Sequence, residues 1–265
     1  RYFDVGIAEA HAVTFAGGLA ANEKTPIVAI YSTFLQRAYD QIIHDISLQK
    51  LPVIFCLDRS GLVGEDGATH HGVLDIAYMR CIQGMIVTAP KDGNELKDLL
   101  FTATNYKKGP FSIRYPKESS INFDNKSSNI IEIGSWEVIN KGDDILILSV
   151  GSMVNRSISA MEKLKEKNIQ AEVINCRFIK PMDLDYLSNN FSRFSKVVTI
   201  EEGVLDGGFG EGVVSWSSAN NLKNNILNLG LPNDFVDHGS RKDLLQEVKL
   251  DSESLYMKIM EFVNE

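Results

Sequence analysis

The chain has 265 residues, 44% of them hydrophobic and 23% charged, which is typical of a globular protein with one large or two ordinary domains. Its formal net charge of −8 argues against a nucleic-acid or anionic-membrane partner, and no apolar run reaches the ~20 residues of a membrane span. The three cysteines, Cys56, Cys81 and Cys176, lie far apart among apolar neighbours, so we expect buried free thiols and a cytoplasmic location.

The first part of the chain predicts an α/β domain with a mostly parallel sheet. Residues 8–21, rich in alanine and glycine, suit a helix packed closely on a sheet. Short apolar runs at 27–31, 53–57, 85–88 and 111–114 are expected as strands, with helices over 35–46 and 95–104 between them. Strand, helix and strand form a βαβ unit with a right-handed crossover. We assign residues 1–118 to this domain.

A change in composition separates a second domain. Residues 117–130 are polar and rich in serine and asparagine, and we place a linker at 119–134. Beyond it, residues 144–150, 171–176 and 196–200 are expected as strands, with helices over 157–167 and 184–194. The predicted fold class is therefore α/β, with two domains that each contain a mostly parallel sheet, the second at 135–265.

Several polar and aromatic residues follow the predicted strands of the first domain. In open parallel sheets, ligands bind beyond the carboxyl ends of the strands. Arginine forks match the geometry of phosphate and carboxylate groups, so this edge predicts a site for an anionic small molecule. The residues at this edge are Tyr31, Phe34, Arg37, Arg59 and Arg114.

The stretch GEDGATHHG, residues 64–72, also follows a predicted strand. A metal site is disfavoured because His70 and His71 are adjacent and point in different directions, and structural-zinc spacing is absent. Its residues alone leave open a polar turn or a catalytic loop, in which histidine can transfer protons near neutral pH.

Two further features allow more than one interpretation. Glu9 lies in an otherwise apolar stretch and is either an exposed residue of a helical first turn or a buried acid with a function. Residues 207–212, GGFGEG, resemble a phosphate loop but lack the lysine and Ser/Thr of a P-loop. We expect a tight chain reversal there.

Several blocks together resemble the transketolase-like thiamine diphosphate enzymes, and among them the 1-deoxy-D-xylulose-5-phosphate synthases. The YSTFLQRAYDQ and DGxTHxG blocks are typical of the synthases, and transketolases and pyruvate dehydrogenase β subunits carry different residues there. The resemblance implies an N-terminally truncated pyrimidine-binding domain at 1–118 and a transketolase C-terminal domain at 135–265. The blocks are DVGIAE (4–9), YSTFLQRAYDQ (31–41), DR (58–59), DGATHHG (66–72), RYP (114–116), EEG (201–203) and GGFG (207–210).

The resemblance also implies a role for each residue. Glu9 would bind the N1′ nitrogen of the cofactor's aminopyrimidine, and Phe34 would stack on that ring. Ala10 stands where the family usually has glutamine, which could loosen the bonding around Glu9. Around the acceptor substrate, the implied residues are Tyr31, Arg37, Arg59 and Arg114, with Asp66 and His70 acting on its hydroxyl and carbonyl groups and His71 supporting them.

The implied reaction condenses pyruvate with D-glyceraldehyde 3-phosphate to 1-deoxy-D-xylulose 5-phosphate and carbon dioxide. Its product feeds isoprenoid synthesis by the non-mevalonate route, and thiamine and pyridoxal synthesis. The implied cofactors are thiamine diphosphate and Mg2+. The family's GDG…N motif, which holds magnesium and diphosphate, has no match in this sequence. We therefore expect no magnesium ligands in this chain, a homodimer, and no activity without the missing N-terminal half.

Two alternatives remain. The chain could be a non-catalytic fragment or dimerisation partner. It could also be a β-like subunit of a 2-oxo acid dehydrogenase, which the DGATHHG block argues against.

Overall fold

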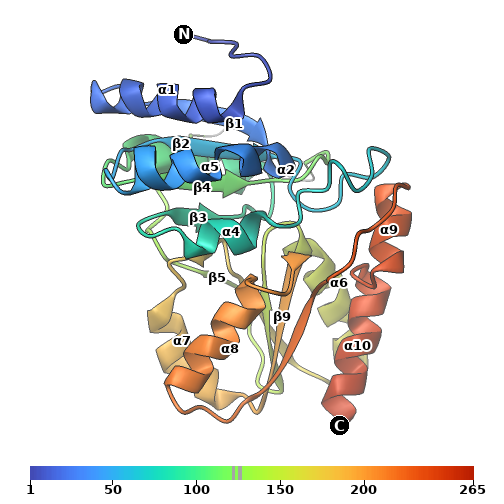
Figure 1. The fold of residues 1–265 in the computed structure, drawn as a ribbon. Coiled ribbons are helices and arrows are strands. Elements are labelled where there is room, and N and C mark those ends of the chain that lie inside the picture. Colours follow the sequence, from blue (N-terminus) through green and yellow to red (C-terminus); the bar gives the residue numbers. More distant parts are fainter. Residues whose placement is uncertain (121–122, 125–126) are drawn as a thin grey trace.

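Short apolar runs form two sheets in the computed structural model, which describes residues 1–120, 123–124 and 127–265 (Figure 1). The first sheet has the strand order β1-β2-β4-β3-β8. Its first four strands are parallel, as expected, and begin at or within one residue of the predicted runs. The bounds are β1 (Ile27–Tyr31), β2 (Ile54–Asp58), β3 (Ile86–Thr88), β4 (Phe111–Arg114) and β8 (Phe178–Lys180).

The helices of this domain differ from expectation in two places, since the helix Asp75–Cys81 was not predicted and the helix at 35–46 is irregular. The helix expected over 35–46 is a helical run whose winding changes three times. It ends in a π-helical segment, where the amide of Leu48 donates to the carbonyl of Ile43 at 2.9 Å. Arg37 therefore lies in a 3₁₀ turn. The elements are α1 (Glu9–Ala21), α2 (Ser32–Leu35), η1 (Gln36–Ala38), α3 (Tyr39–Gln41), η2 (Ile42–Ser47), α4 (Asp75–Cys81) and α5 (Gly93–Asn105).

The second sheet has the order β10-β9-β6-β7-β5, with only β5 antiparallel to its neighbour. Six elements, η3 included, overlap predicted ones, whereas β5, β10 and the helices α8 to α10 were not predicted. The bounds are β5 (Glu137–Asn140), β6 (Ile145–Ser149), β7 (Ala171–Asn175), β9 (Lys196–Val204), β10 (Asn225–Leu231), α6 (Met153–Glu166), α7 (Leu184–Asn190), η3 (Phe191–Arg193), α8 (Phe209–Ala219), α9 (Arg241–Glu247) and α10 (Ser252–Asn264).

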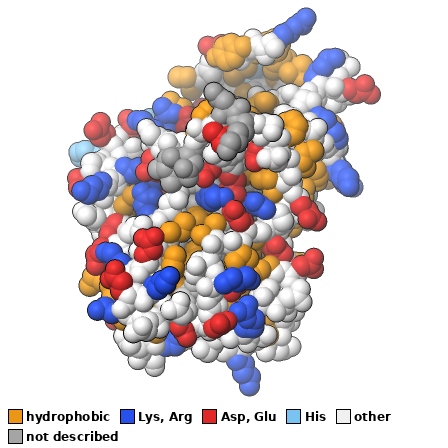
Figure 2. Space-filling model, turned by 180° about the vertical axis from the view of Figure 1, so that it is seen from behind, with side chains coloured by type: hydrophobic (Ala, Val, Ile, Leu, Met, Phe, Trp, Pro, Cys, Tyr) orange, Lys and Arg blue, Asp and Glu red, His pale blue; other side chains and the backbone are white. Residues whose placement is uncertain are grey.

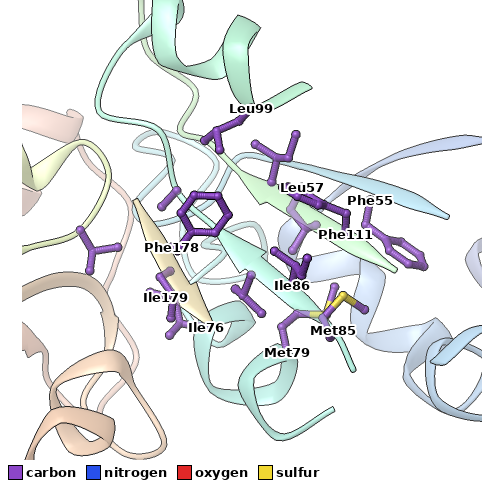
Figure 3. Packing of buried hydrophobic residues seen from close by; sticks show 14 of the residues in the cluster. Phe55, Leu57, Ile76, Met79, Met85, Ile86, Leu99, Phe111, Phe178 and Ile179 are labelled. Atoms are coloured by element: carbon purple, nitrogen blue, oxygen red, sulfur yellow. The ribbon is translucent and has the colours of Figure 1, made fainter. Parts of the chain in front are cut away.

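Strand β8 joins the two domains. It comes from the second half of the chain but pairs antiparallel with β3, Thr88 lying opposite Phe178. Figure 3 shows Phe178 of β8 near Phe111 of β4, and Ile179 beside Ile76 of α4, and the same cluster of buried side chains continues into the second domain. The two domains therefore share a hydrophobic core.

Three other expectations concern the surface and the linker. Cys56 and Cys176 are buried free thiols, but the expectation is wrong for Cys81, which is exposed because it ends the short helix α4. The described residues of the expected linker, 119–134, contain no helix or strand, and 121–122 and 125–126 lie outside the description. No helix in the described ranges is both long enough and apolar enough to cross a bilayer.

Hydrophobic side chains are exposed around the N-terminal segment and α1. Figure 2 shows them at the upper end of the molecule, where Figure 1 places these elements. Tyr2 and Ile7 are 88% and 94% exposed, and Phe3 and Phe15 are partly exposed with their rings in edge-to-face contact.

Candidate active site

Parallel pairing brings the ends of three strands to one edge of the first sheet. Tyr31, the last residue of β1, lies opposite Asp58, the last residue of β2. Arg114 ends β4 and lies opposite Leu57. Tyr31, Arg59 and Arg114 therefore start from one edge of the sheet, as the sequence predicted.

Glu9 lies at this edge as the first residue of α1, where the helix dipole favours a carboxylate. Its side chain is only 11% exposed, so Glu9 is a first-turn residue but not an exposed one, and a function for it stays a prediction. Arg37 donates from Nη1 to Glu9 Oε1 at 2.8 Å, which ties the start of α1 to η1. The other carboxylate oxygen has no hydrogen bond to a described residue.

An aromatic cluster continues from Arg37. The Arg37 guanidinium lies 4.9 Å from the ring centre of Phe34, which stacks on Tyr31 with a centroid distance of 5.5 Å. His70 meets Phe34 edge to face at 5.2 Å, and the Arg59 guanidinium lies 3.7 Å from the ring centre of Tyr31. Cation–π and edge-to-face contacts of this kind fix the orientation of the groups involved. The structure thus brings six predicted site residues into one chain of contacts.

Arg59 is held in an unusual backbone conformation. Its φ of +60° lies in the left-handed region, which non-glycine residues rarely adopt and which is enriched at functional sites. Asp58 compensates by accepting from the Arg59 amide at 2.7 Å and from its Nη1 at 2.6 Å. The guanidinium is thereby held over Tyr31.

Asp66 lies near His70 and Arg59 of this cluster but takes no part in the ring contacts. It accepts a hydrogen bond from Lys117 Nζ at 3.1 Å, and this bond is the main reason why the pKa of Asp66 lies below its ordinary value. Sequence reasoning missed Lys117, although it directly follows the Arg114-Tyr115-Pro116 block. His70, in the same loop, is within 2.9 Å of the Thr69 hydroxyl.

Arg114 is buried beneath the edge, with 6% of its surface exposed. Its Nε donates to Asp75 Oδ2 at 2.9 Å, and its Nη2 donates to the backbone carbonyl of Glu202 at 2.9 Å. No contact joins it to the aromatic cluster within the described residues, so its role toward a substrate stays a prediction. Asp75, which also accepts from the Ser60 hydroxyl, carried no signal in its local sequence.

The glycine-rich stretch at 207–212 begins α8 and already has an anionic partner. The buried carboxylate of Glu201 accepts from the amides of Phe209 and Gly210, both at 2.8 Å. A chain reversal with close packing therefore accounts for this stretch, as predicted, and Gly207 has a φ of +72°. Within the described residues, no group of three or more His, Cys, Asp or Glu side chains could hold a metal ion.

Comparison with known proteins identifies both domains. The family model for the transketolase pyrimidine-binding domain matches residues 1–121, and the model for the transketolase C-terminal domain matches residues 134–255. Together they cover most of the chain. The predicted fold class and the resemblance read from the sequence are confirmed.

Curated relatives include the 1-deoxy-D-xylulose-5-phosphate synthases of Aquifex aeolicus and Rippkaea orientalis. The first is 48% identical over 255 residues and the second 46% identical over 263 residues, covering 96% and 98% of this chain. These matches cover only 40% and 41% of the relatives, so the chain spans about two fifths of their length.

Solved structures lead to the same family. A split gene transketolase, described as an inactive β4 tetramer, matches with a TM-score of 0.89 and 26% identity, over 100% of this chain and 84% of that chain. A transketolase mutant from Pichia stipitis shares the fold, with a TM-score of 0.80 and 20% identity over 100% of this chain and 38% of its own. The chain therefore belongs to the transketolase family, as a pyrimidine-binding domain followed by a C-terminal domain, and corresponds to the C-terminal part of 1-deoxy-D-xylulose-5-phosphate synthases.

Proposed function

We propose that this chain supplies the pyrimidine-binding and acceptor-binding side of an active site that condenses pyruvate with D-glyceraldehyde 3-phosphate. The products would be 1-deoxy-D-xylulose 5-phosphate, a precursor for isoprenoids, thiamine and pyridoxal, and carbon dioxide. The observation that carries this proposal is the continuous contact from Glu9 through Arg37 and Phe34 to Tyr31 and Arg59.

The cluster fits the aminopyrimidine part of thiamine diphosphate. Glu9 is mostly buried and keeps one oxygen without a partner among the described residues, so it can accept a hydrogen bond from a ring nitrogen. Beside it, Phe34 offers an aromatic surface, and the buried Ser32 hydroxyl has no hydrogen-bond partner among the described residues. When bound, thiamine diphosphate supplies the nucleophilic carbon that allows pyruvate to lose carbon dioxide. We expect the Mg2+ ligands in the part of the relatives that this chain does not match.

The remaining residues would bind and orient the acceptor. Arg59, held over Tyr31, would present its guanidinium to the phosphate, with Arg114 behind it and Arg37 beside it. Asp66, whose lowered pKa keeps it ionised, would accept a hydrogen bond from an acceptor hydroxyl. His70 would hold or donate a proton at the aldehyde oxygen, a role that histidine side chains often take in general acid–base catalysis.

The same proposal requires partners. We propose that the 265 residues are inactive by themselves and act together with the diphosphate-binding half of a synthase, in a homodimer. Two observations support this: the similar split gene transketolase chain is described as an inactive tetramer, and apolar side chains are exposed around the N-terminal segment.

A chimaera tests the function directly. This chain would replace the matching C-terminal 40% of the Aquifex aeolicus synthase, and product formation from pyruvate would be measured with different acceptors. We expect 1-deoxy-D-xylulose 5-phosphate with glyceraldehyde 3-phosphate, and none from the 265-residue chain alone. Acyl transfer to lipoamide would instead support a dehydrogenase β-like subunit. A folded chimaera that binds thiamine diphosphate but uses no acceptor would support a non-catalytic partner.

A further inference from the structure

The loop that contains Asp66 and His70 rests against the C-terminal domain along most of its length. We call residues 61–72 the acceptor loop and residues 237–241 the supporting segment. Gly64 accepts from the Gly239 amide at 3.4 Å, and Arg241 donates to the Leu62 carbonyl at 2.7 Å. A Cβ atom at Gly67 would lie only 3.0 Å from Cβ of His238. The supporting segment therefore follows the acceptor loop closely.

Within the described structure, His71 is the acceptor-loop residue whose own side chain hydrogen-bonds to this segment, whereas the contact at Leu62 comes from the Arg241 side chain. Hydrogen bonds at both ring nitrogens determine the tautomer of His71. The side chain is 5% exposed. A backbone amide can only donate, so the Val63 amide, 3.0 Å from Nδ1, requires that nitrogen to be the unprotonated acceptor. Nε2 then carries the proton and donates to the carbonyl of Asp237 at 3.2 Å. Both ring nitrogens are used, one within the loop and one across the domain boundary.

His70 faces the opposite way, against Phe34. The base of the loop is closed by reciprocal backbone hydrogen bonds between Gly61 and Gly72, at 2.7 and 2.9 Å. A Cβ at Gly72 would collide with the Arg59 carbonyl and with Ser32, so the base is packed closely against the start of α2. The loop is thus held at its base by Gly61 and Gly72, and against the supporting segment at Leu62, Gly64 and His71. His71 lies between the base residue Gly72 and His70 in the sequence, so its contacts bear directly on the position of His70.

We propose that His71 is a positioning residue through which the C-terminal domain holds His70 and Asp66 at the acceptor site. This assignment rests on the proposed function for its catalytic consequence, but its structural part can be tested separately. It gives the C-terminal domain a part in building the site. The two hydrogen bonds of the His71 ring need one acceptor and one donor on the same planar side-chain group. The amide group of glutamine also provides both, whereas leucine provides neither.

The structural part can be tested on the 265-residue chain by hydrogen exchange of the amides of residues 61–72. We expect exchange about tenfold faster or more in His71→Leu, because the loop then opens locally, and near the wild-type rate in His71→Gln. The exposed His44→Leu serves as a matched control. Nitrogen-15 chemical shifts of the wild-type ring should report protonated Nε2 and unprotonated Nδ1.

Unchanged exchange in His71→Leu, equally fast exchange in both variants, or a ring protonated on Nδ1 would overturn the proposal. The nitrogen-15 shifts are measured on the wild-type His71 ring, so they test its hydrogen-bonded tautomer even if a variant fails to fold. In the chimaera, His71→Leu should raise KM for the acceptor by about tenfold, because the acceptor contacts are misplaced, with KM for pyruvate unchanged. An active His71→Leu chimaera whose KM for the acceptor is unchanged would refute the role of His71 in positioning the acceptor contacts. An inactive wild-type chimaera would refute the proposed function and leave the exchange results standing.

Discussion

Glu201 shows how a buried acid is accommodated in the C-terminal domain. Its carboxylate caps the start of α8 by accepting from the amides of Phe209 and Gly210. Burial nevertheless raises the pKa of Glu201 from 4.5 to about 7, since these two amides and the nearby Arg114 and Arg80 only partly offset the loss of water. The folded protein therefore holds the Glu201 proton more tightly than the unfolded chain does.

This shift predicts a pH dependence of stability. Between the unfolded pKa of 4.5 and the folded value of about 7, the folded state binds more protons, so the contribution of Glu201 to the free energy of unfolding falls as pH rises. The free energy of unfolding of the wild type minus that of Glu201→Gln should fall by on the order of 2 kcal/mol across this window and level off above it. Urea denaturation at several pH values measures it, with the exposed Glu247→Gln as control. A difference that is constant or rises with pH would contradict the account.

Most residues of the candidate site could be located from the sequence. Tyr31, Arg59 and Arg114 follow apolar runs, and parallel strands bring such positions to one edge. The resemblance added Glu9, which its local pattern left undecided. Lys117 and Asp75 could not be found, because the first acts through an ion pair with Asp66 and the second through one with Arg114. Such pairs depend on tertiary placement, and the roles of all these residues stay predictions.

At the scale of elements, α1 packs closely on the π-helical segment η2. The contact is made at Gly17, where a Cβ atom would lie 2.9 Å from Ile46 Cδ1 and 3.5 Å from the Asp45 carbonyl. The neighbouring Gly18 is exposed and has nothing within 4 Å of such an atom. The alanine and glycine content of residues 8–21 predicted close packing on a sheet, but the contact at Gly17 is with η2. The π-helical winding of η2 has no periodic signal in the sequence.

The two glycines form a matched pair for mutation. Gly18→Ala should raise the free energy of unfolding by about 0.5–1 kcal/mol, because alanine is the better helix former and meets no neighbour. Gly17→Ala should lose this gain or become destabilising, since Ile46 is fully buried and cannot move aside freely. Chemical denaturation of both variants checks the prediction. Equal stabilisation by both would show that α1 does not approach η2 as closely as the structure places it.

For the whole molecule, the two domains are joined more tightly than a linker between them would suggest. Strand β8 extends the first sheet, and Arg80 donates from α4 to the carbonyls of Gly207 and Gly208 in the second domain. With three residues, β8 is too short for its alternation to be recognised, so this connection could not be predicted from the sequence. The division into two α/β units could be predicted from the sequence, because each unit has its own set of longer apolar runs.

Because the two domains share a hydrophobic core, we predict that a mutation in this core destabilises both of them. Phe178→Ala removes a fully buried ring from β8 and should lower the free energy of unfolding by about 3–5 kcal/mol. Hydrogen exchange should accelerate in β3 and β4 of the first domain as well as in β7 and β9 of the second. The exposed Phe235→Ala is the control. Acceleration confined to the second domain would mean that the domains unfold independently.

The central claim is that Glu9 and the residues in contact with it form half of a thiamine diphosphate site. The most direct test is the rate of 1-deoxy-D-xylulose 5-phosphate formation by the chimaera with wild-type chain and with Glu9→Gln. The wild-type chain should give product, and the variant should lose about 10²- to 10⁴-fold in kcat, because the amide cannot hold the proton that a carboxylate holds. Undiminished product formation by Glu9→Gln would contradict it.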